Sequence, residues 1–216
     1  MIPDGEYYRP LFSPWHGFKE FGALYDSIRP YTLVSSDRCY VLSTLARQSA
    51  NLRGEFWECG VYKGGTAMLL GKVLEKRGHQ TTLRLFDTFQ GMPDTDPSFD
   101  LHKKGDFADT SLNHVVARVE YKSTIIHEGL IPDSFAGLDN TTIAFAHIDV
   151  DIFSSVLACC EFIQPRLAHG GIIVFDDYGF SSCPGARKAV DSYYENRAQI
   201  PLVLPTGQAI VFNAPI

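Results

Sequence analysis

The sequence of 216 residues lacks any apolar run long enough to cross a membrane. Its opening residues, MIPDGEYYRP, lack the basic and apolar regions of a secretory signal peptide. We therefore expect a cytoplasmic protein with no membrane partner. The chain also lacks runs of five or more like charges, and its formal net charge is −6. This balance argues against a broad surface for nucleic acid, so we expect no nucleic-acid partner.

Cysteine is scarce and shows no recognisable pattern. The five cysteines form neither CxxC pairs nor the spacing of a zinc site, and their odd number favours free thiols in a reducing compartment. Cys159 and Cys160 fall within an apolar helical pattern, where we expect them to pack in the core. Internal repeats, linkers and low-complexity tracts are absent too, so we expect one globular core.

From about Phe56 onward, the chain contains alternating strand and helix patterns, which are typical of βαβ units and a parallel sheet. Strands are predicted at 55–59, 82–86, 123–127, 142–148 and 171–175, with helices near 65–77, 111–119, 155–167 and 184–197. Residues 202–212 contain two short β patterns around a Pro-Thr-Gly turn, which indicates a hairpin. We therefore predict an α/β, Rossmann-like fold with a seven-stranded, mostly parallel sheet, a C-terminal antiparallel hairpin and helices on both faces.

Residues 1–40 differ from the rest because they are rich in aromatic residues and proline. They are too apolar for a disordered tail. One interpretation is an arm packed on the core or on a second subunit, which makes a homo-oligomer possible. The other is a lid over a ligand site. We therefore separate residues 1–40, as an arm or lid, from a main domain at 41–216.

Acidic residues follow the fourth and fifth predicted strands. Asp149 and Asp151 follow the fourth, and Asp176 and Asp177 follow the fifth. Right-handed βαβ geometry brings both strand ends to one edge of the sheet, so these carboxylates should converge. Clustered carboxylates share protons or hold a cation, and a set of oxygen ligands suits Mg²⁺ better than zinc. The alternative is that such aspartates are turn residues or helix caps, and Asp151 suits a cap for a helix starting near Ser154.

The first predicted strand leads into a glycine-rich loop, in the segment FWECGVYKGGTA. Gly60, Gly64 and Gly65 allow the backbone to approach a ligand closely. The loop is not the GxGxxG loop of nicotinamide enzymes, and Glu58 before it suits a ligand with a positively charged amine. Asp87 ends the second strand, where nucleotide-binding folds often place a carboxylate on ribose hydroxyls, although a structural role is equally compatible with its position.

Four segments together resemble the macrocin O-methyltransferase family: GEFWECGVYKGGTA, LFDTFQGMP, HIDVDIFSS and GGIIVFDDYG. This family consists of metal-dependent class I methyltransferases that methylate sugar hydroxyls in antibiotic biosynthesis. The resemblance runs from about Tyr31 to Phe212. It implies a seven-stranded Rossmann-like sheet, S-adenosylmethionine as methyl donor and Mg²⁺ as cofactor. The domain at 41–216 is then a methyltransferase domain.

The resemblance also assigns roles to individual residues. Asp149, Asp176 and Asp177 match the metal ligands, and Asp149 also matches the general base. The segment YTLVS, at residues 31–35, resembles the family's lid. Matches to the donor site, from the lid through the methionine and ribose regions to the adenine end, are Thr32, Val34, Glu58, Gly60, Tyr62, Gly64, Gly65, Thr66, Asp87, Thr88, Glu128 and Gly129.

The chain departs from the family at His147, where an aliphatic residue is common. Strand alternation points His147 the same way as Asp149, so it either supports the metal site or is a core histidine. We predict O-methylation of a vicinal diol on a sugar or another small natural product. Three alternatives stay open: a nicotinamide oxidoreductase, a Mg²⁺-dependent phosphohydrolase and a non-catalytic interaction module.

Overall fold

The structure is a computed structural model that describes residues 13–16, 20–78 and 81–213. Its centre is a seven-stranded sheet with the order β3-β2-β1-β4-β5-β7-β6. The strands are β1 (Glu55–Cys59), β2 (Leu83–Asp87), β3 (Thr124–Glu128), β4 (Ile143–Ile148), β5 (Leu167–Phe175), β6 (Leu202–Val203) and β7 (Ala209–Phe212). The helices are α1 (Glu20–Ile28), α2 (Ser36–Ser49), α3 (Gly65–Arg77), α4 (Leu112–Arg118), α5 (Phe153–Ile163) and α6 (Pro184–Tyr194), with short 3₁₀ helices at Arg29–Tyr31, Asp133–Phe135 and Gln164–Arg166.

The pairing of the strands confirms the predicted fold class. Strands β1 to β5 pair in parallel with their neighbours, and β7 runs antiparallel to β5. Strand β6 pairs antiparallel with β7, which is the predicted hairpin. The carboxyl ends of the five parallel strands therefore lie along one edge of the sheet, the edge that positions the site.

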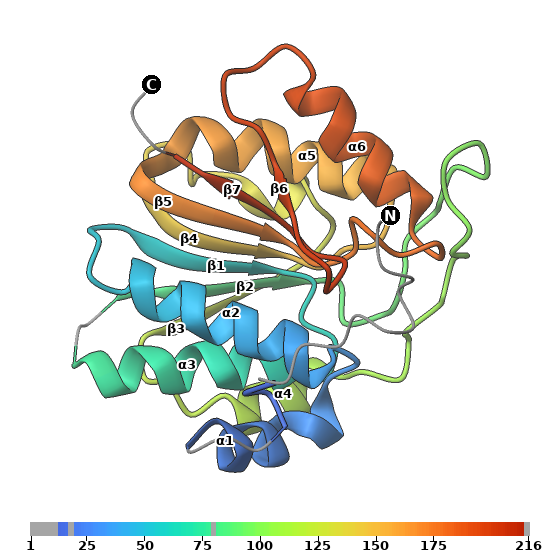
Figure 1. Cartoon of the computed structure of the whole chain (residues 1–216). Helices are drawn as coiled ribbons and strands as arrows, with labels where there is room; N and C mark the ends of the chain where they lie inside the picture. Colours follow the sequence, from blue (N-terminus) through green and yellow to red (C-terminus); the bar gives the residue numbers. More distant parts are fainter. Residues whose placement is uncertain (1–12, 17–19, 79–80, 214–216) are drawn as a thin grey trace, which may run out of the picture.

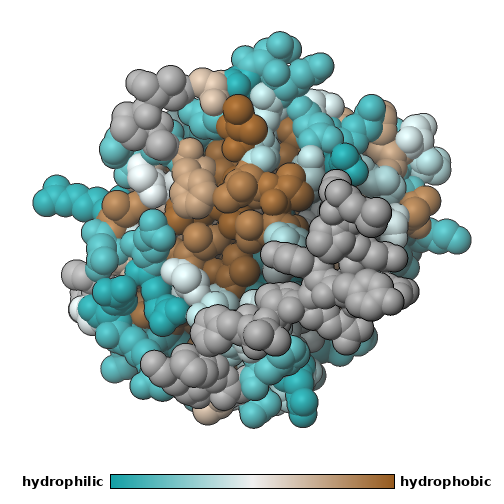
Figure 2. Space-filling view, in the orientation of Figure 1, coloured by the Kyte–Doolittle hydropathy of each residue, from teal (hydrophilic) through white to brown (hydrophobic). Residues whose placement is uncertain are grey.

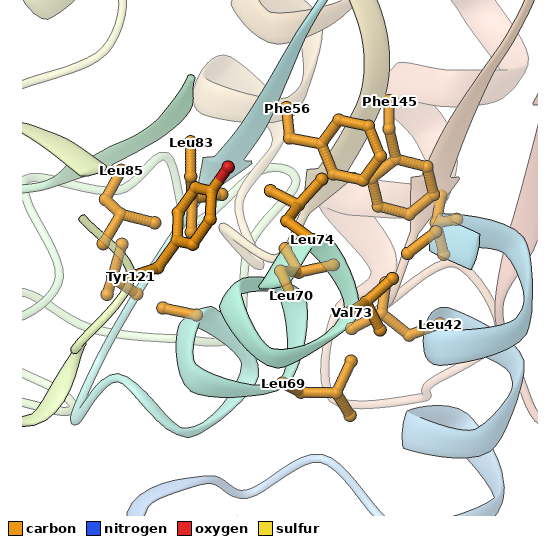
Figure 3. Packing of buried hydrophobic residues seen from close by; sticks show 14 of the residues in the cluster. Leu42, Phe56, Leu69, Leu70, Val73, Leu74, Leu83, Leu85, Tyr121 and Phe145 are labelled. Carbon is orange, nitrogen blue, oxygen red and sulfur yellow. The ribbon is translucent and has the colours of Figure 1, made fainter. Parts of the chain in front are cut away.

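Helices cover both faces of the sheet because successive strand residues point in opposite directions (Figure 1). In β1, Phe56 belongs to the apolar cluster under α1 to α4, whereas Trp57 belongs to the cluster under α5 and α6. Figure 3 shows the first cluster, where Leu70 and Leu74 of α3 face the sheet near Phe56. The buried, unpaired Cys159 and Cys160 lie in the second cluster, which confirms their predicted core packing.

Some predicted boundaries shift by a few residues. Helix α5 ends at Ile163 rather than at residue 167, and a 3₁₀ turn containing Pro165 follows it. Proline has no amide hydrogen to continue an α-helix, so the chain turns there and enters β5 at Leu167. The predicted fifth strand, 171–175, is thus the second half of a longer strand. Helix α6 ends at Tyr194, three residues before the predicted end.

The N-terminal segment is described only in part, since residues 1–12 and 17–19 lie outside the described residues. Residues 20–40 form α1, a 3₁₀ turn and the first part of α2. Helix α2 continues past residue 40 and packs against α3, so its described part is continuous with the core. The lid role stays a prediction. Across the ranges that the structure covers, none of the helices has the length and apolar character needed to span a bilayer.

Apolar surface gathers in the middle of the face that Figure 2 shows, with hydrophilic surface around it. Figure 1 draws the sheet across this region, and its C-terminal strands carry the exposed side chains of Leu202, Val203 and Phe212. Strand β6 is at the edge of the sheet, so its exposed Leu202 and Val203 belong to an open edge.

Candidate active site

A cavity of about 270 Å³ lies where the parallel strands end. The loops that follow β1, β2, β3, β4 and β5 border it, together with residues 32–34. The predicted donor and metal residues that line it are Thr32, Val34, Gly60, Tyr62, Thr66, Asp87, Thr88, Gly129, Asp149 and Asp177. The predicted residues that do not line it are Glu58, Gly64, Gly65, Glu128 and Asp176. The structure therefore brings most of the predicted site together around one space.

Two glycines of the first loop are required by close packing. Gly60 has a φ of 85°, and a Cβ there would lie 1.8 Å from the carbonyl oxygen of Asp149. Gly65 begins α3, and a Cβ there would lie 2.7 Å from the Cβ of Thr32. The loop after β1 therefore touches both the end of β4 and the N-terminal segment. Gly64, the N-cap residue of α3, packs next to Val115 rather than on the cavity.

Asp87 holds the loops after β1 and β2 together. Its Oδ2 accepts hydrogen bonds from the backbone N–H groups of Val61, at 2.7 Å, and Tyr62, at 2.9 Å. Its Oδ1 accepts one from the N–H of Phe89, at 2.7 Å. Each carboxylate oxygen can accept more than one hydrogen bond, so Asp87 can also face a ligand in the cavity. Its ribose-binding role stays a prediction.

Other predicted donor residues are held by local hydrogen bonds. The Tyr62 hydroxyl donates to Asp109 at 2.9 Å, and the Thr88 hydroxyl donates to the carbonyl of Gly91 at 2.8 Å. Thr32 Oγ1 accepts from the N–H of Val34 at 3.0 Å. These bonds fix three segments of the cavity wall. Glu128 is exposed at the end of β3, and Gly129 follows it.

A chain of buried polar groups runs below the cavity from Glu58 to Arg38. His147 Nδ1 lies 3.0 Å from Glu58 Oε1, and His147 Nε2 lies 3.6 Å from Asp176 Oδ1. Asp176 also accepts a hydrogen bond from Gln208 Nε2 at 2.8 Å and pairs with the Arg38 guanidinium. Among the described residues, Glu58 Oε2 has no hydrogen-bond partner. His147 is therefore both a buried core residue and a direct neighbour of Asp176 in the acidic cluster, which consists of Asp149, Asp176 and Asp177.

The charges of this cluster are only partly compensated. Burial raises the pKa of Asp149, and the nearby charge of Asp176 adds to this, so that the pKa reaches about 8. Burial, then the charge of Asp149, raises the pKa of Asp177 well above its usual value. Asp176 differs: burial acts to raise its pKa, but His147 and Arg38 outweigh burial and leave that pKa lowered.

The pKa of His147 is raised as well, although burial has the opposite effect on an imidazole. Burial acts to lower its pKa, but the carboxylates of Asp176 and Glu58 outweigh burial and raise the pKa to about 10. Ligand atoms of His147, Asp149 and Asp176 all lie within 4.8 Å of one another. Since the cluster holds more carboxylates than cations, it has the chemistry to accept a divalent ion.

Asp151 does not cap the following helix, so the capping prediction is wrong. The N-cap residue of α5 is Ile152, and the N–H of Phe153 donates instead to Asp100 Oδ1 at 2.8 Å. Asp151 has a φ of 57° and lines the cavity, where its Oδ1 accepts from Cys183 Sγ at 3.4 Å. Asp100 belongs to a distant loop. It accepts the hydrogen bond from the start of α5 that Asp151 was predicted to accept.

Sequence reasoning missed several residues of the site. Arg38, His102 and Cys183 line the cavity, and Gln208 reaches Asp176 from the loop before β7. Arg38 and Asp176 are separated by 138 positions, so no local spacing links them. Cys183 was visible in the sequence only as one unpaired cysteine. Contacts across the sheet edge, which the strand pattern does not specify, bring these residues to the site.

The strand order and the cavity at the carboxyl ends define a class I methyltransferase fold. The solved structure of the O-methyltransferase NovP has the same fold: its TM-score is 0.75 over 86% of this chain and 83% of that chain, at 20% sequence identity. The chain belongs to the macrocin-O-methyltransferase (TylF) family, whose sequence profile matches residues 27–205. The predicted family is thereby confirmed.

Two curated relatives share part of this chain. A 4'-O-methyltransferase of Streptomyces olivaceus that acts on 8-demethyl-8-(2,3-dimethoxy-alpha-L-rhamnosyl)-tetracenomycin-C is 29% identical over 65% of this chain and 58% of its own length. The demethyldecarbamoylnovobiocin O-methyltransferase of Streptomyces niveus is 27% identical over 66% of this chain and 59% of its own length. The match therefore spans less than two thirds of either relative.

Proposed function

We propose that this chain transfers a methyl group from S-adenosylmethionine to a hydroxyl of a sugar or another diol-bearing natural product, with Mg²⁺ as cofactor. The observation that carries the proposal is the meeting of three features at one cavity: the loop after β1, Asp87 at the end of β2, and Asp149 and Asp177 after β4 and β5. Family membership and the two relatives, which act on natural products, support it.

The cavity wall suits the proposed donor. Its sulfonium supplies an electrophilic methyl group, so the protein has to supply orientation and electrostatics. Gly60 brings backbone close to the cavity, and Asp87 offers carboxylate oxygens for hydroxyl groups. Glu58 does not line the cavity but lies behind its wall, where Oε2 is buried and has no partner among the described residues, so it would suit an amine only if the amine reached that depth. Thr32 and Val34 close the same space from the N-terminal side.

The acidic cluster suits a Mg²⁺ ion. Asp149, Asp176 and Asp177 are the residues that would hold it, and their oxygen atoms are the ligands that Mg²⁺ prefers. Burial, and then the charges of the neighbouring aspartates, raise the pKa values of Asp149 and Asp177, and a bound cation would oppose both shifts. A bound Mg²⁺ would supply a positive charge that makes a hydroxyl more acidic and orients it. Two neighbouring hydroxyls chelate an ion better than one, which favours a vicinal diol as acceptor.

A proton acceptor is the remaining requirement, because an alcohol is a poor nucleophile until its proton leaves. Asp149 is our proposed base, since it lines the cavity at the end of β4. Asp151 is the second candidate, because it lines the same cavity and burial raises its pKa. Unlike Asp149, it does not share the group of ligand atoms formed with His147 and Asp176.

Methyl transfer from labelled donor to a rhamnoside and to a catechol tests this mechanism. We expect transfer with Mg²⁺ and a loss of at least tenfold when EDTA replaces it. Undiminished transfer with EDTA would contradict the metal role. The Asp149→Asn variant should bind the donor normally but lose turnover.

The Asp151→Asn variant separates the two candidate bases. Asparagine tolerates the positive φ of position 151, so the backbone need not change. If Asp149 is the base, this variant keeps most of its turnover when Mg²⁺ is saturating. If instead the Asp151 variant loses turnover while the Asp149 variant regains it at high Mg²⁺, Asp151 is the base and Asp149 only a ligand.

A further inference from the structure

Three side chains from separate loops meet on one wall of the cavity. His102 comes from the loop between β2 and α4, Asp151 follows β4, and Cys183 precedes α6. His102 Nε2 lies 3.6 Å from Cys183 Sγ and 3.8 Å from Asp151 Oδ1, and the Sγ and Oδ1 atoms are 3.4 Å apart. Metal bonds of roughly 2.0–2.3 Å in a tetrahedral arrangement put such ligand atoms about 3.4–3.6 Å apart.

We propose that His102, Asp151 and Cys183 form a binding site for a divalent transition-metal ion of the zinc type, with one coordination position open to the cavity. Its three ligands differ from the proposed Mg²⁺ ligands, although Asp151 is also the second candidate base, and metal binding here can be measured without methyl transfer. The sequence did not predict this site, because the spacing of its cysteines did not indicate zinc. The three ligands come from positions 102, 151 and 183, so only the fold brings them together.

The chemistry of the ligand set selects the metal. Imidazole nitrogen and thiolate sulfur favour zinc and similar ions, whereas Mg²⁺ prefers oxygen ligands. The neighbouring cluster of Asp149, Asp176 and Asp177 supplies carboxylate oxygens, with a nitrogen of His147 beside them, and no sulfur. Three protein ligands also leave room for a fourth ligand, as in zinc sites that bind water or substrate. We therefore expect the site of His102, Asp151 and Cys183 to prefer a transition-metal ion and the oxygen cluster to prefer Mg²⁺.

The imidazole is oriented by a second carboxylate. Asp106 Oδ2 lies 3.1 Å from His102 Nδ1 and also accepts from the N–H of Lys103 at 3.0 Å. Occupation of Nδ1 leaves Nε2 directed at Asp151 and Cys183. Histidine ligands of zinc are commonly held by a carboxylate in this way, and its removal typically lowers metal affinity 10- to 100-fold.

The site is accessible and carries the charge that a cation needs. His102, Asp151 and Cys183 all line the cavity, and the first two are partly exposed, so an ion has a path from solvent. Asp177, whose carboxylate accepts the N–H of Asp151 at 3.3 Å, adds negative charge beside the site. On binding, a metal–sulfur bond forms and the thiol hydrogen of Cys183 leaves as a proton to solvent.

A cobalt titration of the metal-free protein tests the proposal. We expect one equivalent of Co²⁺ to produce thiolate-to-cobalt charge-transfer absorption, and Zn²⁺, but not excess Mg²⁺, to abolish it. The absorption should be lost in Cys183→Ser and retained in Cys160→Ser, a matched change of a buried cysteine elsewhere. Absorption that is absent, or that survives in Cys183→Ser, would overturn the site and leave the three residues as a hydrogen-bonded group only.

Two further variants keep the test decisive if Cys183→Ser does not fold. Asp106→Asn leaves all three ligands in place, so its Co²⁺ absorption should persist with an affinity lowered 10- to 100-fold. An unchanged affinity would contradict the arrangement of ligands proposed here. Asp176→Asn alters the oxygen cluster and should keep the full absorption. Since neither donor nor acceptor is present, failure of this titration is distinguishable from failure of the proposed methyl transfer.

Discussion

Arg38 is the guanidinium that pairs with the acidic cluster at its buried end. It pairs with Asp176, whose side chain is 0% exposed, and its guanidinium carbon also lies 4.7 Å from the ring centre of Phe180. Removing one partner of a buried ion pair leaves an uncompensated charge, which is far more costly than loss of a surface pair. The residue therefore matters for stability as well as for the shape of the cavity.

We predict that Arg38→Met lowers the free energy of unfolding by about 3–5 kcal/mol in the presence of EDTA. Urea denaturation followed by fluorescence measures this change. Lys76→Met is the matched control, because Lys76 pairs with Glu20 while both side chains are exposed, and its loss should cost less than about 1 kcal/mol. Similar losses in the two variants would show that Arg38 does not compensate Asp176.

At the level of elements, the start of α3 couples the N-terminal segment to the cavity. Gly65 is where Tyr31 and Thr32 pass over this helix, and Thr32 and Val34 border the cavity. Gly60, Gly64 and Gly65 were interpreted from sequence as part of a ligand loop. In the structure, Gly65 packs against the N-terminal segment, and Gly60 packs against Asp149 where β1 and β4 end.

We predict that Gly65→Ala weakens binding of S-adenosylmethionine at least tenfold and lowers the unfolding free energy by about 1–3 kcal/mol, the usual cost of overpacking. The added Cβ would lie 2.7 Å from the Cβ of Thr32, so the segment must move. Calorimetric titration measures the affinity. Gly78→Ala, at the other end of α3, meets nothing within 4 Å and has a φ of 69°. It should lose stability only, so equal donor affinities in the two variants would contradict this coupling.

For the whole molecule, ligand binding should appear as a shift of the unfolding transition. S-adenosylmethionine at about 100 times its Kd adds about 2.7 kcal/mol of stability. For a protein of this size, that corresponds to a rise in Tm of roughly 5–10 °C. Nicotinamide nucleotides and phosphate esters should produce no comparable rise in a thermal shift assay. A rise with either of them, and none with S-adenosylmethionine, would favour an oxidoreductase or a phosphohydrolase instead.

Much of the fold could be predicted because its signals are local or follow from topology. The alternating patterns placed β1 to β5 within a few residues, and the Pro-Thr-Gly turn placed the hairpin. Right-handed crossovers then bring acids at successive strand ends to one edge, so Asp149 and Asp177 were expected at a common cavity and both line it. The predicted end of α5 was wrong because Pro165 ends the helix before its apolar pattern ends.

The sequence by itself therefore determined the order of elements, the sheet and the edge at which the acids gather. Only the tertiary structure decided their partners: Arg38 and Gln208 for Asp176, Glu58 for His147, and Asp100 in place of Asp151 at the start of α5. It also decided the meeting of His102, Asp151 and Cys183. The physical reason is that strand and helix patterns are set by neighbours along the chain. The charge and hydrogen-bond partners of a buried side chain come instead from whichever distant loops pack against it.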